Sequence, residues 1–111
     1  MHELAIMQSV VNVCEREAER QGFTRVESIT LAVGAVSGIV PECLFEFFSA
    51  AARGSVAEGA RITTRTIPAA IECPDCGYAG EIRGLECPQC GGAAYRLVHG
   101  REFYIDSLEV E

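Results

Sequence analysis

Four of the six cysteines lie in two matching segments that have the spacing of metal ligands. Cys73-Pro-Asp-Cys76-Gly and Cys87-Pro-Gln-Cys90-Gly repeat one pattern, with ten residues between the two pairs. The glycine after each pair can adopt the left-handed backbone conformation that lets backbone N–H groups face sulfur. Four thiolates suit a tetrahedral Zn²⁺, with bonds of about 2.3 Å and no open coordination position. The pattern predicts a structural zinc site, with tetrahedral iron or a dithiol redox pair as alternatives.

The chain begins Met1-His2-Glu3, which places an imidazole and a carboxylate at its first residues. The terminal amine of Met1, the deprotonated amide nitrogen of His2 and the His2 imidazole can form two fused chelate rings. A fourth donor completes a square, and tetragonal nitrogen sites favour Ni²⁺ or Cu²⁺ over zinc. The other interpretation is a solvated helix start, at which Glu3 interacts favourably with the helix dipole. The motif alone leaves both interpretations open.

Hydrophobic periodicity predicts the elements that position these groups. Apolar residues at three- and four-residue spacing indicate an amphipathic helix from almost the first residue to Gly22, and a second helix that starts at Pro41 and stops at Gly54. Alternating and β-branched residues indicate three strands. The predicted order is helix (1–21), strand (28–33), helix (41–53), strand (61–67) and strand (102–110), with the cysteine segment before the last strand.

The simplest arrangement of these elements is an α+β fold, with a three-stranded sheet that carries two helices on one face. A small zinc lobe, residues 71–98, would be inserted before the last strand, and residues 1–70 and 99–111 would form the main domain. The alternation of the last strand slips near Asp106 and Ser107, which suggests a bulge.

Several other side chains have ordinary structural interpretations. Cys14 and Cys43 lie on or near the apolar stripes of the two helices and are expected to be small buried hydrophobes. The three aromatic residues of the second helix are expected in the core, with one of them an option for a partner surface. Two tyrosines are expected to pack around the zinc loops. These expectations concern Phe45, Phe47, Phe48, Tyr78 and Tyr95.

The composition excludes some function classes. The 111 residues are 49% hydrophobic, which is enough for a core, and 16 acidic against 9 basic residues give a net charge of −7. Such a surface repels phosphate backbones and anionic lipids, so we expect no nucleic-acid or membrane partner. No stretch approaches the roughly 18–20 apolar residues that span a bilayer, and the first ten residues do not have the pattern of a signal peptide. We therefore expect a cytoplasmic protein whose cysteines are not structural disulfides.

Taken together, these motifs resemble the HypA family of nickel metallochaperones, which mature [NiFe]-hydrogenases and in some organisms urease. The resemblance covers essentially the whole chain and rests on four segments. They are MHE at the start, the GAVSGI turn (34–39), RGSVAEGA after the second helix (53–60), and the paired CPxCG knuckles.

The resemblance implies an α+β nickel-binding domain with an inserted zinc lobe and no enzymatic activity. It places nickel on the His2 imidazole and on the amide nitrogens of His2 and Glu3, with the Glu3 side chain implicated in some members. It also implies delivery of Ni²⁺ to the hydrogenase large-subunit precursor, with a HypB-type GTPase and, as a further option, urease maturation factors as partners. The sequence does not decide between a monomer and a homodimer.

The chain departs from the family at one place. Some members carry histidines beside the zinc cysteines, whereas Gly77 and Gly91 follow the pairs here. His99, the second of the two histidines, is either a solvated loop residue or a fourth nickel ligand.

Two other function classes remain as alternatives: a zinc-ribbon interaction or nucleic-acid module without nickel, and a thiol-redox enzyme. Bound zinc would suppress a redox nucleophile, and no βαβ redox fold is evident from the sequence.

Overall fold

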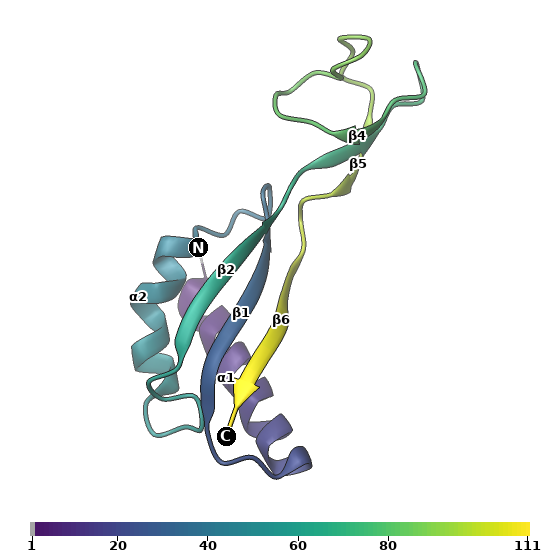
Figure 1. The fold of residues 1–111 in the computed structure, drawn as a ribbon. Helices are drawn as coiled ribbons and strands as arrows, with labels where there is room; N and C mark the ends of the chain where they lie inside the picture. Colours follow the sequence, from purple (N-terminus) through teal and green to yellow (C-terminus); the bar gives the residue numbers. More distant parts are fainter. Residues whose placement is uncertain (1) are drawn as a thin grey trace.

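The computed structural model describes residues 2–111, which form two helices and two three-stranded sheets (Figure 1). Helix α1 spans Glu3–Gln21 and ends as predicted at Gly22, whose φ of 83° lets its N–H donate to the Ala18 carbonyl oxygen at 2.8 Å. Helix α2 spans Pro41–Ala52 and starts on a proline, whose missing N–H is not needed in a first helical turn.

The main sheet has the strand order β2-β1-β6, with β1 at its centre. Strand β1 (Val26–Gly34) pairs in parallel with β2 (Arg61–Ile67) and antiparallel with β6 (Phe103–Val110). Since α2 connects the two parallel strands, β1-α2-β2 is a βαβ unit. The sequence alone did not predict this unit, because periodicity does not reveal strand direction. Neither cysteine pair lies in it.

A bulge in β6 lies at the predicted place. Thr30 pairs with Ser107 and the next residue of β1, Leu31, pairs with Ile105, so Asp106 has no partner in the register. Because of this extra residue, the apolar side chains before and after the bulge, Ile105 and Leu108, lie on the same face of the sheet, toward the helices.

Both helices cover one face of the main sheet, as predicted (Figure 1). The core between them contains Phe48, but Phe45 and Phe47 are 44% and 38% exposed, so the prediction that they are core residues was wrong. A sheet of three strands has a narrow face, and Leu44, Phe48, Ala51 and Ala52 of α2 fill the space over it. Cys14 is fully buried as predicted, whereas Cys43 is only half-buried. The largest fully buried side chains of this core are Met7, Cys14, Val26, Ile29, Leu31 and Leu44.

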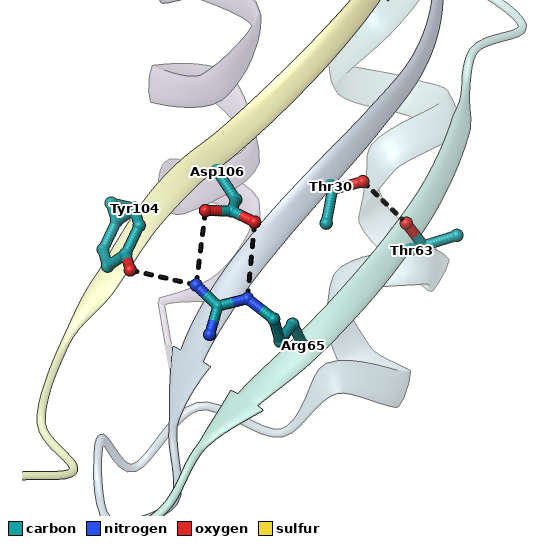
Figure 2. Close-up of polar contacts among 5 residues, drawn as sticks. All are labelled: Thr30, Thr63, Arg65, Tyr104 and Asp106. Atoms are coloured by element: carbon teal, nitrogen blue, oxygen red, sulfur yellow. Dashed lines mark hydrogen bonds and ion pairs between the residues drawn. The ribbon is translucent and has the colours of Figure 1, made fainter.

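The other face of the main sheet carries polar side chains (Figure 2). Arg65 donates hydrogen bonds to both carboxylate oxygens of Asp106, at 3.3 and 3.2 Å, and to the Tyr104 hydroxyl at 3.1 Å. The guanidinium reaches from β2 across β1 to β6. Ala32, which is paired with both Arg65 and Tyr104, is fully buried although the alternation assigned it to the polar face. A small residue in the central strand leaves room for this bridge.

Residues 70–99, which we call the cysteine lobe, contain the second sheet. Strands β3 (Ala70–Glu72), β4 (Ala79–Glu81) and β5 (Arg96–His99) have the order β4-β3-β5. The cysteine spacing predicted the metal loops of this segment, whereas its strands were not predicted. The lobe extends away from the helices, and the molecule measures 52 × 26 × 17 Å (Figure 1).

Backbone hydrogen bonds fix the segment between the lobe and β6 to the end of β1 and the turn after it. The Gly34 N–H donates to the Glu102 carbonyl oxygen and the Val36 N–H to the Gly100 carbonyl oxygen, both at 2.7 Å. A Cβ atom on Gly34 would lie 2.2 Å from the Gly100 oxygen, so only glycine permits this approach. Neither helix of residues 2–111 has both the length and the apolar character needed to cross a bilayer.

Candidate metal centres

The four predicted zinc cysteines lie together at the end of the cysteine lobe. The Sγ atoms of Cys73 and Cys90 are 3.7 Å apart, those of Cys76 and Cys87 are 3.6 Å apart, and all four lie within 4.8 Å of one another. A tetrahedron with metal–sulfur bonds of about 2.3 Å has edges of about 3.8 Å. The sulfurs therefore have the spacing of a four-coordinate site. Both of the short sulfur–sulfur distances join a cysteine of one knuckle to a cysteine of the other.

The two knuckles have the same backbone geometry. Gly77 and Gly91 have φ values of 79° and 75°, the left-handed conformation expected from the sequence. Their N–H groups donate to the carbonyl oxygens of Cys73 and Cys87, at 2.8 and 2.9 Å. The Gly92 N–H also approaches the Cys90 sulfur at 3.4 Å. The turns thus aim both thiols of each pair inward and place backbone dipoles near sulfur, which favours the thiolate.

The thiols of the cluster do not ionise alike. Desolvation opposes ionisation of Cys87, but the backbone N–H groups of Cys90 and Gln89 outweigh it and lower the Cys87 pKa to about 7. At Cys76 the Tyr78 N–H favours the thiolate, yet desolvation and the neighbouring thiols raise its pKa to about 12. One sulfur is therefore ready to bind a cation near neutral pH, whereas four thiolates together require a metal to compensate their charge.

Few apolar residues support this site. The buried cluster of the lobe consists of Ala69, Ile71, Ile82 and two of the cysteines, with Tyr78 and Tyr95 packed against it as predicted. The tyrosine hydroxyls donate to loop carbonyl oxygens, Tyr78 to Glu81 at 2.7 Å and Tyr95 to Leu85 at 2.9 Å. These bonds fix the loops, but the buried apolar surface is small.

The second predicted site lies at the start of α1. Met1, whose amine was a candidate ligand, lies outside the described residues. His2 is exposed and holds the N-cap position, where its carbonyl oxygen accepts the first helical hydrogen bond from the Ile6 N–H at 2.9 Å. Glu3 is the first residue of α1 and is 6% exposed. An exposed histidine thus lies next to a buried glutamate.

His99, the candidate fourth nickel ligand, lies at the end of β5 beside the junction with the main sheet. Its Nδ1 is 2.8 Å from Oε2 of Glu102, and the Gly100 N–H donates to the other oxygen of Glu102 at 2.6 Å. These two hydrogen bonds, that of His99 first, lower the pKa of Glu102 to about 2. Glu102 was not predicted as a partner of His99, although the spacing of the two residues in HGRE (99–102) indicates such a contact.

The structure brings together only part of the predicted ligand set. Within residues 2–111, the four cysteines are the single group of three or more His, Cys, Asp or Glu side chains whose ligand atoms lie at metal-binding distances. His2, Glu3 and His99 do not form such a group. Their role in nickel binding stays a prediction.

Comparison with known proteins identifies the family. The model of the family described as hydrogenase/urease nickel incorporation, metallochaperone, hypA matches residues 1–110. The chain belongs to the HypA family. It is 42% identical to the hydrogenase maturation factor HypA of Geobacter metallireducens and 39% identical to that of Geobacter sulfurreducens, in each case over the full length of both chains.

Solved structures of HypA proteins have the same fold. The solution structure of the Ni metallochaperone HypA from Helicobacter pylori is 23% identical, covers 99% of this chain and 97% of its own, and superposes with a TM-score of 0.72. A second solution structure of a HypA protein, also 23% identical, covers 100% and 97% with a TM-score of 0.76. The resemblance inferred from the sequence is confirmed. The chain is a maturation factor of a metallochaperone family rather than a catalytic enzyme.

Proposed function

We propose that this protein binds Ni²⁺ at its N-terminal Met-His-Glu and delivers it to the [NiFe]-hydrogenase large-subunit precursor. The observation that carries the proposal is the family match over residues 1–110, which includes both the N-terminal motif and the cysteine lobe. The exposed imidazole of His2 at the start of α1 fits a transfer site. Few protein contacts need to break when such a ligand is exchanged.

The helix start suits coordination by amide nitrogen. The first intrahelical bond runs from the Ile6 N–H to the His2 oxygen, so metal binding through the amides of His2 and Glu3 breaks no helical hydrogen bond. Together with the His2 imidazole these nitrogens favour Ni²⁺ in a square geometry. The terminal amine of Met1 is the alternative nitrogen donor.

His99 is our alternative for the fourth donor. In a metal-bound histidine, one ring nitrogen binds the metal and the other donates to a carboxylate or carbonyl group. The contact between Nδ1 of His99 and Glu102 has this form and leaves Nε2 for the metal. Because His99 and His2 do not form one cluster in the structure, this option requires the two parts to move together when nickel binds.

For the cysteine cluster we propose Zn²⁺. Four sulfur ligands leave no position for a substrate, so the metal would hold the shape of the lobe rather than perform chemistry. Reduced thiols that serve as ligands suit the cytoplasm, where disulfides are rare. We propose residues 71–98 as the zinc lobe, and residues 1–70 and 99–111 as the nickel domain. The partners in this proposal are a HypB-type GTPase, the hydrogenase precursor and, as an option, urease maturation factors.

Extension of the N-terminus tests the nickel site. One or two residues added before Met1 turn the amine into a peptide nitrogen, which gives up its proton far less readily. We expect nickel affinity to fall by about tenfold or more if the amine is a ligand, with zinc content and melting temperature unchanged. His2→Ala should abolish tight nickel binding in the same assay, and His99→Ala tests the fourth donor.

The measurement is a metal count and a nickel titration on untagged protein, before and after nickel addition. A nickel carrier gains nickel without losing zinc, whereas a zinc-ribbon module without nickel function gains none. Full nickel affinity in the extended protein would assign the site to imidazole and amide nitrogens without the amine. Full nickel affinity in His2→Ala would refute the proposed site.

A further inference from the structure

Helix α1 projects beyond the β6 edge of the main sheet (Figure 1). Its apolar stripe is wider than three strands can cover, and a groove of about 470 Å³ lies between α1 and β6. Ile6, Val10 and Val13 line the groove from the helix, and Phe103 and Ile105 line it from the strand. Ile6 and Val13 stay half-exposed there, although the sequence gives both the periodicity of a core face.

Strand β6 presents a pairing edge above this groove. Within residues 2–111, β6 pairs with β1 on one side and with no strand on the other. The Gly34 N–H donates to the backbone carbonyl oxygen of Glu102, so the backbone of Glu102 is directed to β1. Because hydrogen-bonding groups alternate in direction along an antiparallel strand, the Tyr104 backbone is also directed to β1, whereas the N–H and C=O groups of Phe103 and Ile105 point away from it. The two residues that face the groove with their side chains therefore also offer backbone partners.

We propose that this groove binds an extended segment of another protein, which adds to β6 as a fourth strand and places apolar side chains over α1 and basic side chains on the opposite face. Strand addition at an exposed sheet edge is an established mode of peptide recognition, in which the backbone supplies affinity and alternate side chains supply specificity. The proposal does not depend on nickel binding.

The charge at this edge determines the occupant. On β6 and the residues beside it, the acidic residues Glu102, Asp106, Glu109 and Glu111 outnumber the cations Arg101 and Arg65 of β2, of which Arg65 already pairs with Asp106. Pairing of β6 with the β6 of a second copy would bring acidic residues opposite one another, which destabilises a sheet. A segment in which Lys or Arg alternates with Val, Ile or Leu matches both the apolar groove and the acidic open face.

A synthetic peptide tests the groove directly. The probe is an eight-residue peptide of alternating Lys and Val with blocked ends, and the control has the same composition with its lysines and valines in two blocks. In NMR titrations of the full chain, we expect saturable shifts in β6 and in the Ile6 and Val13 methyl groups for the alternating peptide only. Hydrogen exchange should slow at the Phe103 and Ile105 amides, whereas the Tyr104 amide, already directed to β1, should not change.

Protein and peptide variants separate strand addition from charge attraction. Val13→Lys places a charge in the groove and should weaken binding about tenfold or more, since the charge would lose water against apolar side chains. Val36→Lys, which alters a valine that is 50% exposed elsewhere, should change binding less than twofold. N-methylation of the peptide residues that face β6 should abolish binding, whereas N-methylation of the alternate residues should not.

Three results would overturn the proposal. They are equal binding of the block and alternating peptides, no saturable binding of the alternating peptide, and unchanged exchange at Phe103 and Ile105 when binding saturates. Concentration-dependent self-association that broadens the β6 signals would assign the edge to a second copy instead. Circular dichroism of Val13→Lys establishes whether the variant is folded. The N-methylated peptides test strand addition on the unaltered protein, so that test does not depend on the folding of a variant.

Discussion

The core between the helices and the main sheet contains thirteen buried residues, whereas the cluster in the cysteine lobe contains five, of which Cys73 and Cys87 are two. The first region buries enough apolar surface to offset the entropy of ordering its chain. The second buries little, and its side chains converge on four sulfurs. One chain is thus expected to have two sources of stability. We expect the main domain to depend on packing and the lobe to depend on metal binding at its four cysteines.

Removal of one cysteine should have the largest effect and should separate the two regions. In Cys73→Ser, three thiolates and a water bind far less tightly than four thiolates, and structural zinc supplies on the order of 10 kcal/mol in such lobes. We expect loss of the metal and of ordered residues 73–90, with α1 and α2 retained. Metal analysis together with amide NMR spectra measures both. A lobe that keeps its structure without metal would show that packing alone is sufficient to stabilise it.

A core truncation should have the opposite pattern and a smaller effect. Leu44 is fully buried, so Leu44→Ala should lower the free energy of unfolding by about 2–5 kcal/mol while the metal content stays the same. Phe45→Ala, one residue further along α2, is the matched control. Because Phe45 is 44% exposed, we expect a change well below that of Leu44→Ala. Urea denaturation followed by helical circular dichroism gives both values. Equal losses of unfolding free energy in the two variants would contradict the placement of Leu44 in the core and Phe45 at the surface.

Acidification should have the smallest effect, at the junction of the two regions. The hydrogen bonds from His99 and Gly100 lower the pKa of Glu102 from its ordinary value of 4.5 to about 2. A carboxyl whose pKa falls on folding stabilises the protein above its unfolded pKa, so this contribution is present above 4.5 and is lost as the pH falls toward 2.

Glu102→Gln tests that contribution. The difference in unfolding midpoint between the native protein and the variant should be present near pH 6 and should diminish at about pH 3, because the carboxyl binds a proton as the chain unfolds. Glu109→Gln serves as a second carboxyl change in β6. A difference that does not depend on pH would mean that the charge of the Glu102 carboxylate does not stabilise the fold, and that its side chain acts only through hydrogen bonds that do not need the charge.

Local sequence patterns predicted those parts of the fold that local physics determines. The period of the apolar residues, Gly22 and Pro41 predicted both helices nearly to the residue, and the slip in alternation located the bulge at Asp106. The glycines after each cysteine pair predicted the left-handed turns. In each case the interactions that matter lie within a few residues along the chain.

The predictions that failed or were absent depend on distant residues. Strand direction, and with it the βαβ unit, depends on a crossover that periodicity does not encode. Phe45 and Phe47 are exposed because the width of the sheet, not the hydrophobicity of α2, limits how many aromatic residues the core accepts. The short strands of the lobe were missed because three residues carry too little pattern.

Spacing and residue type were sufficient to predict the two helices, the three long strands, the four-cysteine set and the family to which the chain belongs. Other features are seen only in the folded protein: which sulfurs approach each other across the two knuckles, the Arg65 bridge over Ala32, and the hydrogen bond between His99 and Glu102. The extension of α1 past β6, which leaves an apolar groove, is also seen only there. Most of these features join residues that are far apart in the chain. Their side chains come within contact distance only after the strands have paired and the helices have packed on the sheet.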